Sequence, residues 1–566
     1  MNQTSRTDDI LDNPGWNQSP PSLSAEETTR QDLNGITNRR EQRDHTLQNS
    51  DCQDRPTQLE MTPPREDTAP PIQGGKGDEF NVTAPVVNQS HRQAKVLTFE
   101  FSIPRFLRPL IKFASFIGPG FLIAVAYIDP GNYATDAAAG AESRYALLFV
   151  VLMSNLFAVF LQSLCIKLGT VTGLSLAENC REHLPKWMNM ALYILAESAI
   201  VATDIAEVIG SAISLNLLLK VPLVAGCVIS LVDVLILLIF YRPHGAMWGL
   251  RAFEFFVMFL VIGVVICFCI QLSLIKEQSV GMVFRGYLPS AAVVQGSGIY
   301  QSCGILGATV MPHSLFLGSG TVQPRLREYD AGKAHVDPAA GDEDTPYRPS
   351  IQAIRSCMKY SIVELTLSLF TFALFVNSAI LIVAAAALYG TPGAANADLF
   401  GIYQLLSQSI APAAGTIFGL ALLLSGLSAG IVCTIAGQMI SEGMIKWTCR
   451  PWIRRLLTRS ISIVPSVIIA AAIGREGLNT ALTASQVVLS VILPFVTAPL
   501  VYFTCRNKFM TVGQSRTQAD ETEQTPQSEV VKMRNSWPVS VLAFLVWLVI
   551  TVMNIALLVL VGLGLA

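Results

Sequence analysis

Charged residues are scarce in this chain of 566 residues: Asp, Glu, Lys and Arg make up 14% of it, whereas hydrophobic residues make up 51%. The chain has no GxxxxGK[ST] sequence, which excludes a P-loop nucleotide site as its source of energy. Its eleven cysteines form no CxxC or Cys/His pattern, so we expect them to pack in the core rather than to bind zinc. The net charge of −2 says nothing about nucleic acid, but no basic patch is interleaved with aromatic residues outside the membrane-flanking loops, so we expect no nucleic acid partner.

Long apolar segments are what the chain has in abundance. About 20 apolar residues cross a bilayer as a helix, and eleven segments of that kind follow one another after Phe106. The sequence therefore predicts an all-α polytopic membrane protein with about eleven transmembrane helices. The predicted spans are 110–137, 146–170, 189–218, 223–241, 252–273, 299–320, 357–388, 401–434, 459–474, 481–504 and 538–565.

Three polar segments interrupt this pattern. Residues 1–95 are rich in Gln, Asn, Asp, Arg, Thr and Pro and predict a disordered tail. The tail lacks the basic and apolar regions of a cleavable signal peptide, so the first span is expected to act as the targeting signal. Residues 323–352 and 506–536 are predicted to be flexible loops.

Lys and Arg are concentrated in alternate connections between the spans. Arg105 and Arg108 precede the first span and Lys112 lies at its start, and the connections after the second, fourth, sixth, eighth and tenth spans are also basic. The rule that positive charge stays inside predicts a cytosolic N-terminus, cytosolic loops at 323–352 and 506–536, and a C-terminus outside or in a lumen. We expect the protein in the plasma membrane or an endosomal or vacuolar membrane, with its tail binding trafficking or ubiquitin-ligase adaptors.

A Pro-Gly pair stands in the middle of the first span, in the sequence Asp129-Pro130-Gly131-Asn132. Proline removes a backbone donor, glycine loosens the helix, and a carboxylate in hydrocarbon is costly. Lipid does not tolerate such a break, so it must line a polar cavity inside the protein. The sequence therefore predicts a ligand site here.

The sixth span carries a second break, where Pro312 follows Met311 and precedes His313. Paired interruptions in spans one and six are typical of two inverted five-helix repeats with a substrate site at the bilayer midplane. The repeats are predicted at 106–275 and 295–505, and helix eleven at 537–566.

The residues at the two breaks suggest a cation. Asp129 offers an anionic oxygen, Asn132 a neutral one, and unwound backbone frees carbonyls, a set that alone would suit Na⁺ or Ca²⁺. Met311 adds a soft thioether, which favours Mn²⁺, Fe²⁺ and later transition metals. A first-row divalent cation is one interpretation, and simple gap filling by Met311 in a helical core is the other.

Other motifs accompany the breaks in a fixed order between about residues 105 and 505. They are Gly118-Pro-Gly120, Gln162–Gly173, Ala436–Gly443 and Thr458–Pro465. Together with the two breaks they resemble the Nramp (natural resistance-associated macrophage protein) family of divalent metal transporters, and most of all its fungal manganese and iron members. The resemblance implies a LeuT-type fold, built as a 5+5 inverted repeat with discontinuous helices 1 and 6.

The resemblance also implies roles for single residues. The side chains of Asp129, Asn132 and Met311 and the backbone carbonyls of Ala126 and Ala308 would hold the metal. Gln486 would join them in the occluded state. Met311 would discriminate among metals, so that loss of its sulfur relaxes the rejection of Ca²⁺. Mn²⁺ and Fe²⁺ would be transported substrates, with no resident cofactor and no enzymatic activity.

Three acids lie in the third predicted span: Glu197, Asp204 and Glu207. Spacings of seven and three residues place them on one helical face, where they could pass protons. The alternative is that one of them pairs with Arg459 at the start of the ninth span. The resemblance to the Nramp family implies that the third and ninth spans carry the proton path and that Asp129 is its first acceptor.

His313 is the only one of the six histidines inside a predicted span. An imidazole suits proton handling near neutral pH, although a hydrogen bond that braces the helix beside Pro312 would explain it too.

These observations predict a secondary-active transporter that imports Mn²⁺ or Fe²⁺ together with protons by alternating access. Two alternatives stay open. One is a sodium-coupled amino-acid symporter of the same fold, and the other is a membrane sensor or receptor that binds metal without moving it.

Overall fold

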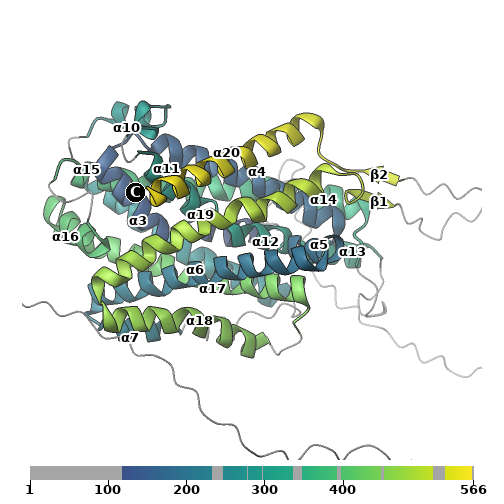
Figure 1. Cartoon of the computed structure of the whole chain (residues 1–566), viewed down its shortest axis with the longest axis horizontal. Coiled ribbons are helices and arrows are strands. Elements are labelled where there is room, and N and C mark those ends of the chain that lie inside the picture. Colours follow the sequence, from purple (N-terminus) through teal and green to yellow (C-terminus); the bar gives the residue numbers. More distant parts are fainter. Residues whose placement is uncertain are drawn as a thin grey trace, which may run out of the picture. The chain divides into compact units, whose positions relative to one another are not determined.

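The computed structural model describes residues 118–231, 247–276, 278–295, 298–334, 347–391, 397–447, 451–513 and 530–563 (Figure 1). The predicted disordered tail, residues 1–95, lies outside these ranges, as do the start of the first predicted span and most of the fourth.

The described chain is almost entirely helical. Its first half contains α2 (Pro119–Val125), α3 (Pro130–Ser143), α4 (Leu148–Thr172), α5 (Leu176–His183), α6 (Lys186–Leu219), α7 (Leu223–Ile229), α9 (Met247–Leu274), α10 (Val280–Gly286) and η1 (Ala291–Val293). Its second half contains α11 (Gly298–Thr309), α12 (Pro312–Gly320), α13 (Gln323–Ala334), α14 (Ile351–Ser368), η2 (Leu369–Ala373), α15 (Leu374–Leu388), α16 (Leu399–Ser409), α17 (Pro412–Ile445), α18 (Pro451–Ala472), α19 (Arg475–Cys505) and α20 (Trp537–Gly562). Strands β1 (Thr511–Gly513) and β2 (Val530–Lys532) pair antiparallel before α20.

Seven helices among the described residues are long and apolar enough to cross a membrane, or eight if the bent pair of α6 and α7 counts as one span. The chain turns by 120° between α6 and α7, which suits two successive spans. The first span is divided into α2 and α3, and the ninth contains a shorter apolar helix over 456–472. The described part of each of the eleven predicted spans is therefore helical, and a polytopic all-α membrane fold is confirmed.

Two long helices, α6 and α17, form the centre of the bundle. They pack along each other, and α18 and α19 pack against α6 (Figure 1). A second close pair, α3 and α15, brings the first broken span against the seventh. Outward-facing Leu, Ile, Val and Phe side chains on α9, α18 and α20 are left exposed, as expected of surfaces that face lipid.

Both predicted helix breaks are present. α2 ends at Val125 and α3 begins at Pro130, while α11 ends at Thr309 and α12 begins at Pro312. In each case proline occupies the first position of the new helix, where its missing N–H costs nothing and its fixed φ suits the helical turn.

Four details of the predicted organisation were wrong. The eighth span, predicted at 401–434, is two helices, because Ala411 is extended (φ −168°) and Pro412 starts α17. The segment 323–352, predicted to be a loop, contains α13, and 506–536 contains β1 and β2. Arg459 lies inside α18, about two turns from its first residue, rather than at the start of the span.

Candidate functional site

The two prolines free two backbone carbonyls that face the breaks. In a continuous helix the carbonyl of Ala126 would accept from residue 130, and that of Ala308 from residue 312. Both positions are proline and carry no N–H. Within the described ranges neither carbonyl accepts another hydrogen bond. The negative C-terminal ends of α2 and α11 therefore present free oxygens, which is favourable for a cation.

Asp129 and Asn132 are held at the first break by the cap of α3. Asp129 is the N-cap, extended because it precedes proline, and its Oδ1 accepts the N–H of Asn132 at 2.9 Å. The Asn132 side-chain amide donates to the carbonyl of Tyr127 at 2.9 Å. Their other oxygens, Asp129 Oδ2 and Asn132 Oδ1, are buried and have no partner among the residues that the structure describes.

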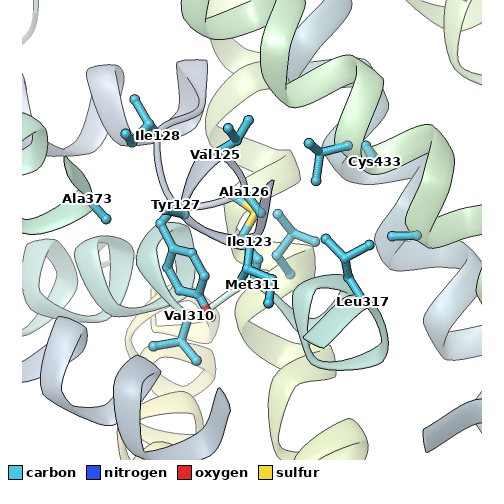
Figure 2. Close-up of a cluster of buried hydrophobic side chains, with 14 of the residues drawn as sticks. Ile123, Val125, Ala126, Tyr127, Ile128, Val310, Met311, Leu317, Ala373 and Cys433 are labelled. Carbon is cyan, nitrogen blue, oxygen red and sulfur yellow. The ribbon is translucent and has the colours of Figure 1, made fainter. Parts of the chain in front are cut away.

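Met311 is fully buried at the second break, as the residue before Pro312. Its carbonyl accepts the hydroxyl of Ser314 at 2.7 Å, which fixes the backbone around the sulfur-bearing side chain. Figure 2 shows the sulfur of Met311 projecting toward the unwound segment that carries Ala126 and Tyr127. The two breaks therefore meet, and the soft atom of one points toward the unwound segment of the other.

Gln486 of α19 lies directly against the first break. A Cβ added to Gly131 would come within 2.1 Å of Gln486 Nε2, so only glycine leaves room for this amide. The Oε1 of Gln486 is also buried without a partner in the described part of the chain. The six predicted metal-site residues are thus brought to one region of the fold.

A cavity of about 290 Å³ reaches this region from the side of α3 and α11. Gln486 forms part of its lining, together with Thr135 of α3, Gln301 and Cys303 of α11, and Ile402 of α16.

A polar cluster lies at the first break. The hydroxyls of Tyr127 and Ser314 lie 3.0 Å apart, and the amide of Gln162 donates to both at 2.9 and 3.0 Å. These bonds join the first break, α4 and α12 in one contact. None of these three residues lines the cavity at Gln486.

Asp136 is a buried acid that sequence reasoning missed. Its side chain is 0% exposed, and neither carboxylate oxygen has a partner in the part of the chain described. It lies one turn before Gly140, where an added Cβ would come within 2.4 Å of the Leu381 carbonyl, so it is on the α3 face that packs against α15. A signal was available, because seven residues from Asp129 is about two helical turns.

The acids of α6 divide into two groups. Arg459 of α18 hydrogen-bonds Asp204 and lies 3.4 Å from Glu207 Oε2, and Ser462 donates to Asp204 Oδ2 at 2.9 Å. The ion-pair alternative from the sequence is therefore present, with two acids rather than one. Glu197 is half-buried two turns earlier on α6.

Asp204, Glu207 and Cys433 of α17 also bring potential metal-ligand atoms within 4.8 Å of one another. The buried guanidinium of Arg459 already supplies a positive charge there. This cluster is therefore an ion pair, and a second metal would have to displace Arg459.

His313 connects the second break to α6. It is 1% exposed, and its Nδ1 lies 3.4 Å from the hydroxyl of Thr203, the residue before Asp204. The contact joins α12, which follows the second break, to α6, which carries the acids. The position of His313 is therefore compatible both with bracing of the helix and with proton handling.

This arrangement defines a polytopic helical membrane protein with a buried, oxygen-rich site between two broken spans. Residues 120–518 match the family model described as natural resistance-associated macrophage protein-like, and the chain belongs to this Nramp family.

Its relatives include named metal transporters. It is 53% identical over 453 residues to the manganese transporter pdt1 of Schizosaccharomyces pombe, covering 80% of this chain and 86% of pdt1. It is 50% identical over 463 residues to the iron transporter SMF3 of Saccharomyces cerevisiae, covering 79% and 96%. A crystal structure of the Eremococcus coleocola manganese transporter matches with a TM-score of 0.66 at 31% identity, covering 80% of this chain and 88% of the other.

Proposed function

We propose that this chain is a secondary-active transporter that imports divalent transition-metal ions, Mn²⁺ or Fe²⁺, into the cytosol by alternating access. One observation carries the proposal: Asp129, Asn132 and Gln486 each bury an oxygen acceptor without a donor in the described chain, beside the carbonyls freed by two prolines. Unsatisfied buried acceptors are costly, and a cation would satisfy them together. The names of the relatives, manganese and iron transporters, agree with this choice.

Met311 would select the metal. The oxygens of the site bind Ca²⁺ and Mn²⁺ alike, but the thioether gains little from Ca²⁺ and more from Mn²⁺ and Fe²⁺. The burial of Met311 and the direction of its sulfur toward the unwound segment at Ala126 support this role over simple packing (Figure 2).

The cavity lined by α3, α11 and Gln486 would face the exterior or a lumen, and the Tyr127–Gln162–Ser314 cluster would close the cytosolic side. This assignment follows the basic connections, which put the N-terminus in the cytosol. A divalent ion entering a negative-inside compartment gains about 4.6 kcal/mol per 100 mV from the potential alone. The plasma membrane and an endosomal or vacuolar membrane both fit, and residues 1–95 would bind trafficking or ubiquitin-ligase adaptors.

Proton symport would use the acids near the site. Asp129 would accept the proton first, and the Asp204–Glu207–Arg459 group would carry it onward. His313, in contact with Thr203, lies where it can link the two. Glu197 would extend the path along α6.

Uptake into proteoliposomes tests the transport proposal. The wild type should take up Mn²⁺ but not leucine, and Mn²⁺ uptake should be accompanied by proton uptake. Asp129→Asn should abolish Mn²⁺ uptake, because asparagine can cap α3 as aspartate does but brings no charge to the metal.

Asp398→Asn is the matched control. Asp398 is the N-cap of α16 and accepts the N–H of Gly401 at 2.7 Å, so the same exchange removes a capping charge from a helix that supplies none of the predicted ligands. Uptake by Asp398→Asn should resemble the wild type. If Asp129→Asn also transported like the wild type, its carboxylate would not be a metal ligand.

A further inference from the structure

The start of α2 rests on buried carboxylates from two other helices. Glu364 Oε1 of α14 accepts the N–H groups of Gly118 and Gly120 at 2.7 and 3.0 Å, which satisfies amides that the first turn leaves open. Glu254 of α9 lies against the same turn, because a Cβ on Gly118 would come within 2.0 Å of its Oε2. The position of α2 therefore depends on how these two acids are held.

Arg325 of α13 supplies the positive charge beneath α2. Its guanidinium Nη2 lies 3.2 Å from Glu254 Oε2, with the two side chains 5% and 6% exposed. Removing one partner from a buried ion pair leaves the other charge uncompensated, which is strongly unfavourable. The position of α2 in this structure, its closed position, therefore depends on Arg325 remaining beside Glu254, where α13 holds it.

The other end of α13 is fastened to the start of α14 by Asp330. Asp330 Oδ2 accepts from the hydroxyl of Tyr347 at 2.7 Å and from the N–H of Ser350 at 3.1 Å, and Oδ1 accepts from the Ser350 hydroxyl at 2.6 Å. Burial, and then the bond to Asp330, raises the pKa of Tyr347 above its usual value, so its hydroxyl remains a donor at neutral pH. Three donors therefore converge on one carboxylate.

A small apolar cluster between α13 and α14 holds the part of α13 that carries Arg325 against α14. Leu326, Ala353 and Cys357 are each at most 1% exposed and pack together. The thiol of Cys357 also donates to the carbonyl of Arg325 at 3.9 Å. The backbone of Arg325 therefore contacts α14. Arg325 and Asp330 are five residues apart on α13, which is about 7.5 Å along the helix axis.

We propose that Asp330 is a positioning residue for the transport cycle: by fastening α13 to α14 it holds Arg325 against Glu254 and so keeps α2 in its closed position. The proposal rests on alternating access as proposed above. Loosening this attachment would favour the state open to the cytosol. Fewer molecules would then present a site to external metal, and the apparent affinity for it would fall by that fraction.

Asp330→Asn and Tyr347→Phe test this from both partners of the contact. Each variant should raise the apparent KM for external Mn²⁺ up to about tenfold, the effect of losing one ordinary hydrogen bond. The maximal rate should change much less, because neither residue touches the metal. Labelling of Cys357 by a polar thiol reagent, followed by digestion and mass spectrometry of the peptide that carries Cys357, should become much faster as α13 lifts from α14. The exposed Cys269 is the internal reference for the reagent.

Glu328→Gln is the control on the same helix. Glu328 pairs with Arg251 at 3.6 Å, with side chains 46% and 35% exposed, so this exchange removes a charge from α13 at a contact that water already screens. Its KM and its Cys357 labelling should match the wild type.

Wild-type KM and labelling in both test variants would overturn the proposal. Faster labelling with an unchanged KM would also overturn it, since α13 would then not control α2, and so would a raised KM with unchanged labelling. A wild-type protein that takes up no divalent metal would instead refute the transport function itself. Tyr347→Phe retains both bonds between Asp330 and Ser350 and leaves the N-cap of α14 intact, so it keeps the test usable if Asp330→Asn does not fold.

Discussion

Gly210 of α6 sets how closely that helix approaches the first break. A Cβ added there would lie 2.3 Å from Cγ and 2.4 Å from Cβ of Pro130. Carbon atoms pack comfortably at about 3.5 Å or more, so Gly210→Ala must push the rigid proline ring and α6 apart by about 1 Å. Because Pro130 directly follows Asp129, this shift moves the carboxylate away from the other ligands.

The cost of such overpacking is about 1–3 kcal/mol. Helix propensity returns up to about 1 kcal/mol when alanine replaces glycine, so the protein should still fold with a small loss of stability. If this cost is met by displacing the Asp129 carboxylate from the other ligands, the affinity for Mn²⁺ should drop by about 5–150-fold, the equivalent of about 1–3 kcal/mol.

Calorimetric titration of purified protein with Mn²⁺ measures this drop. Gly249→Ala is the control, since an added Cβ at Gly249 of α9 meets nothing within 4 Å. Binding within twofold of the wild type for Gly210→Ala would refute the idea that contact between α6 and Pro130 aligns the site.

Two further substitutions test the buried charges by thermal unfolding in detergent. Arg459→Met leaves Asp204 and Glu207 without their counter-charge and should destabilise the protein by about 3–5 kcal/mol; an unchanged melting temperature would mean that the ion pair does not support the fold. Asp136→Val removes a buried carboxylate that has no partner in the described chain, and it should stabilise the protein by about 1–3 kcal/mol. A lower melting temperature for Asp136→Val would mean that the carboxylate is satisfied in the membrane.

The sequence predicted the helix breaks because their cause is local. Pro130 and Pro312 lack an N–H whatever surrounds them, so both positions were correct in the folded protein. The division between α16 and α17 has the same local cause at Pro412, but apolar residues on both sides made the segment resemble one span. A preference of residues before proline for extended backbone would have located it at Ala411.

Contacts between distant segments could not be predicted in this way. Nothing local to Glu364 indicates that it caps α2, more than 240 residues earlier in the chain. The pairing of Arg459 with two acids likewise depends on how α18 packs against α6. The roles of Asp129, Asn132, Met311 and Gln486 as metal ligands stay predictions, although the fold brings these residues together.

The selectivity of Met311 is the most direct test of the central claim, that a soft ligand completes an oxygen site for transition metals. Initial rates of Mn²⁺ and Ca²⁺ uptake should be compared in proteoliposomes for the wild type and Met311→Ala. The account predicts that the wild type transports Mn²⁺ and rejects Ca²⁺, and that the variant loses some Mn²⁺ uptake while it gains clear Ca²⁺ uptake. If the variant rejects Ca²⁺ as strongly as the wild type does, the sulfur of Met311 does not select the metal.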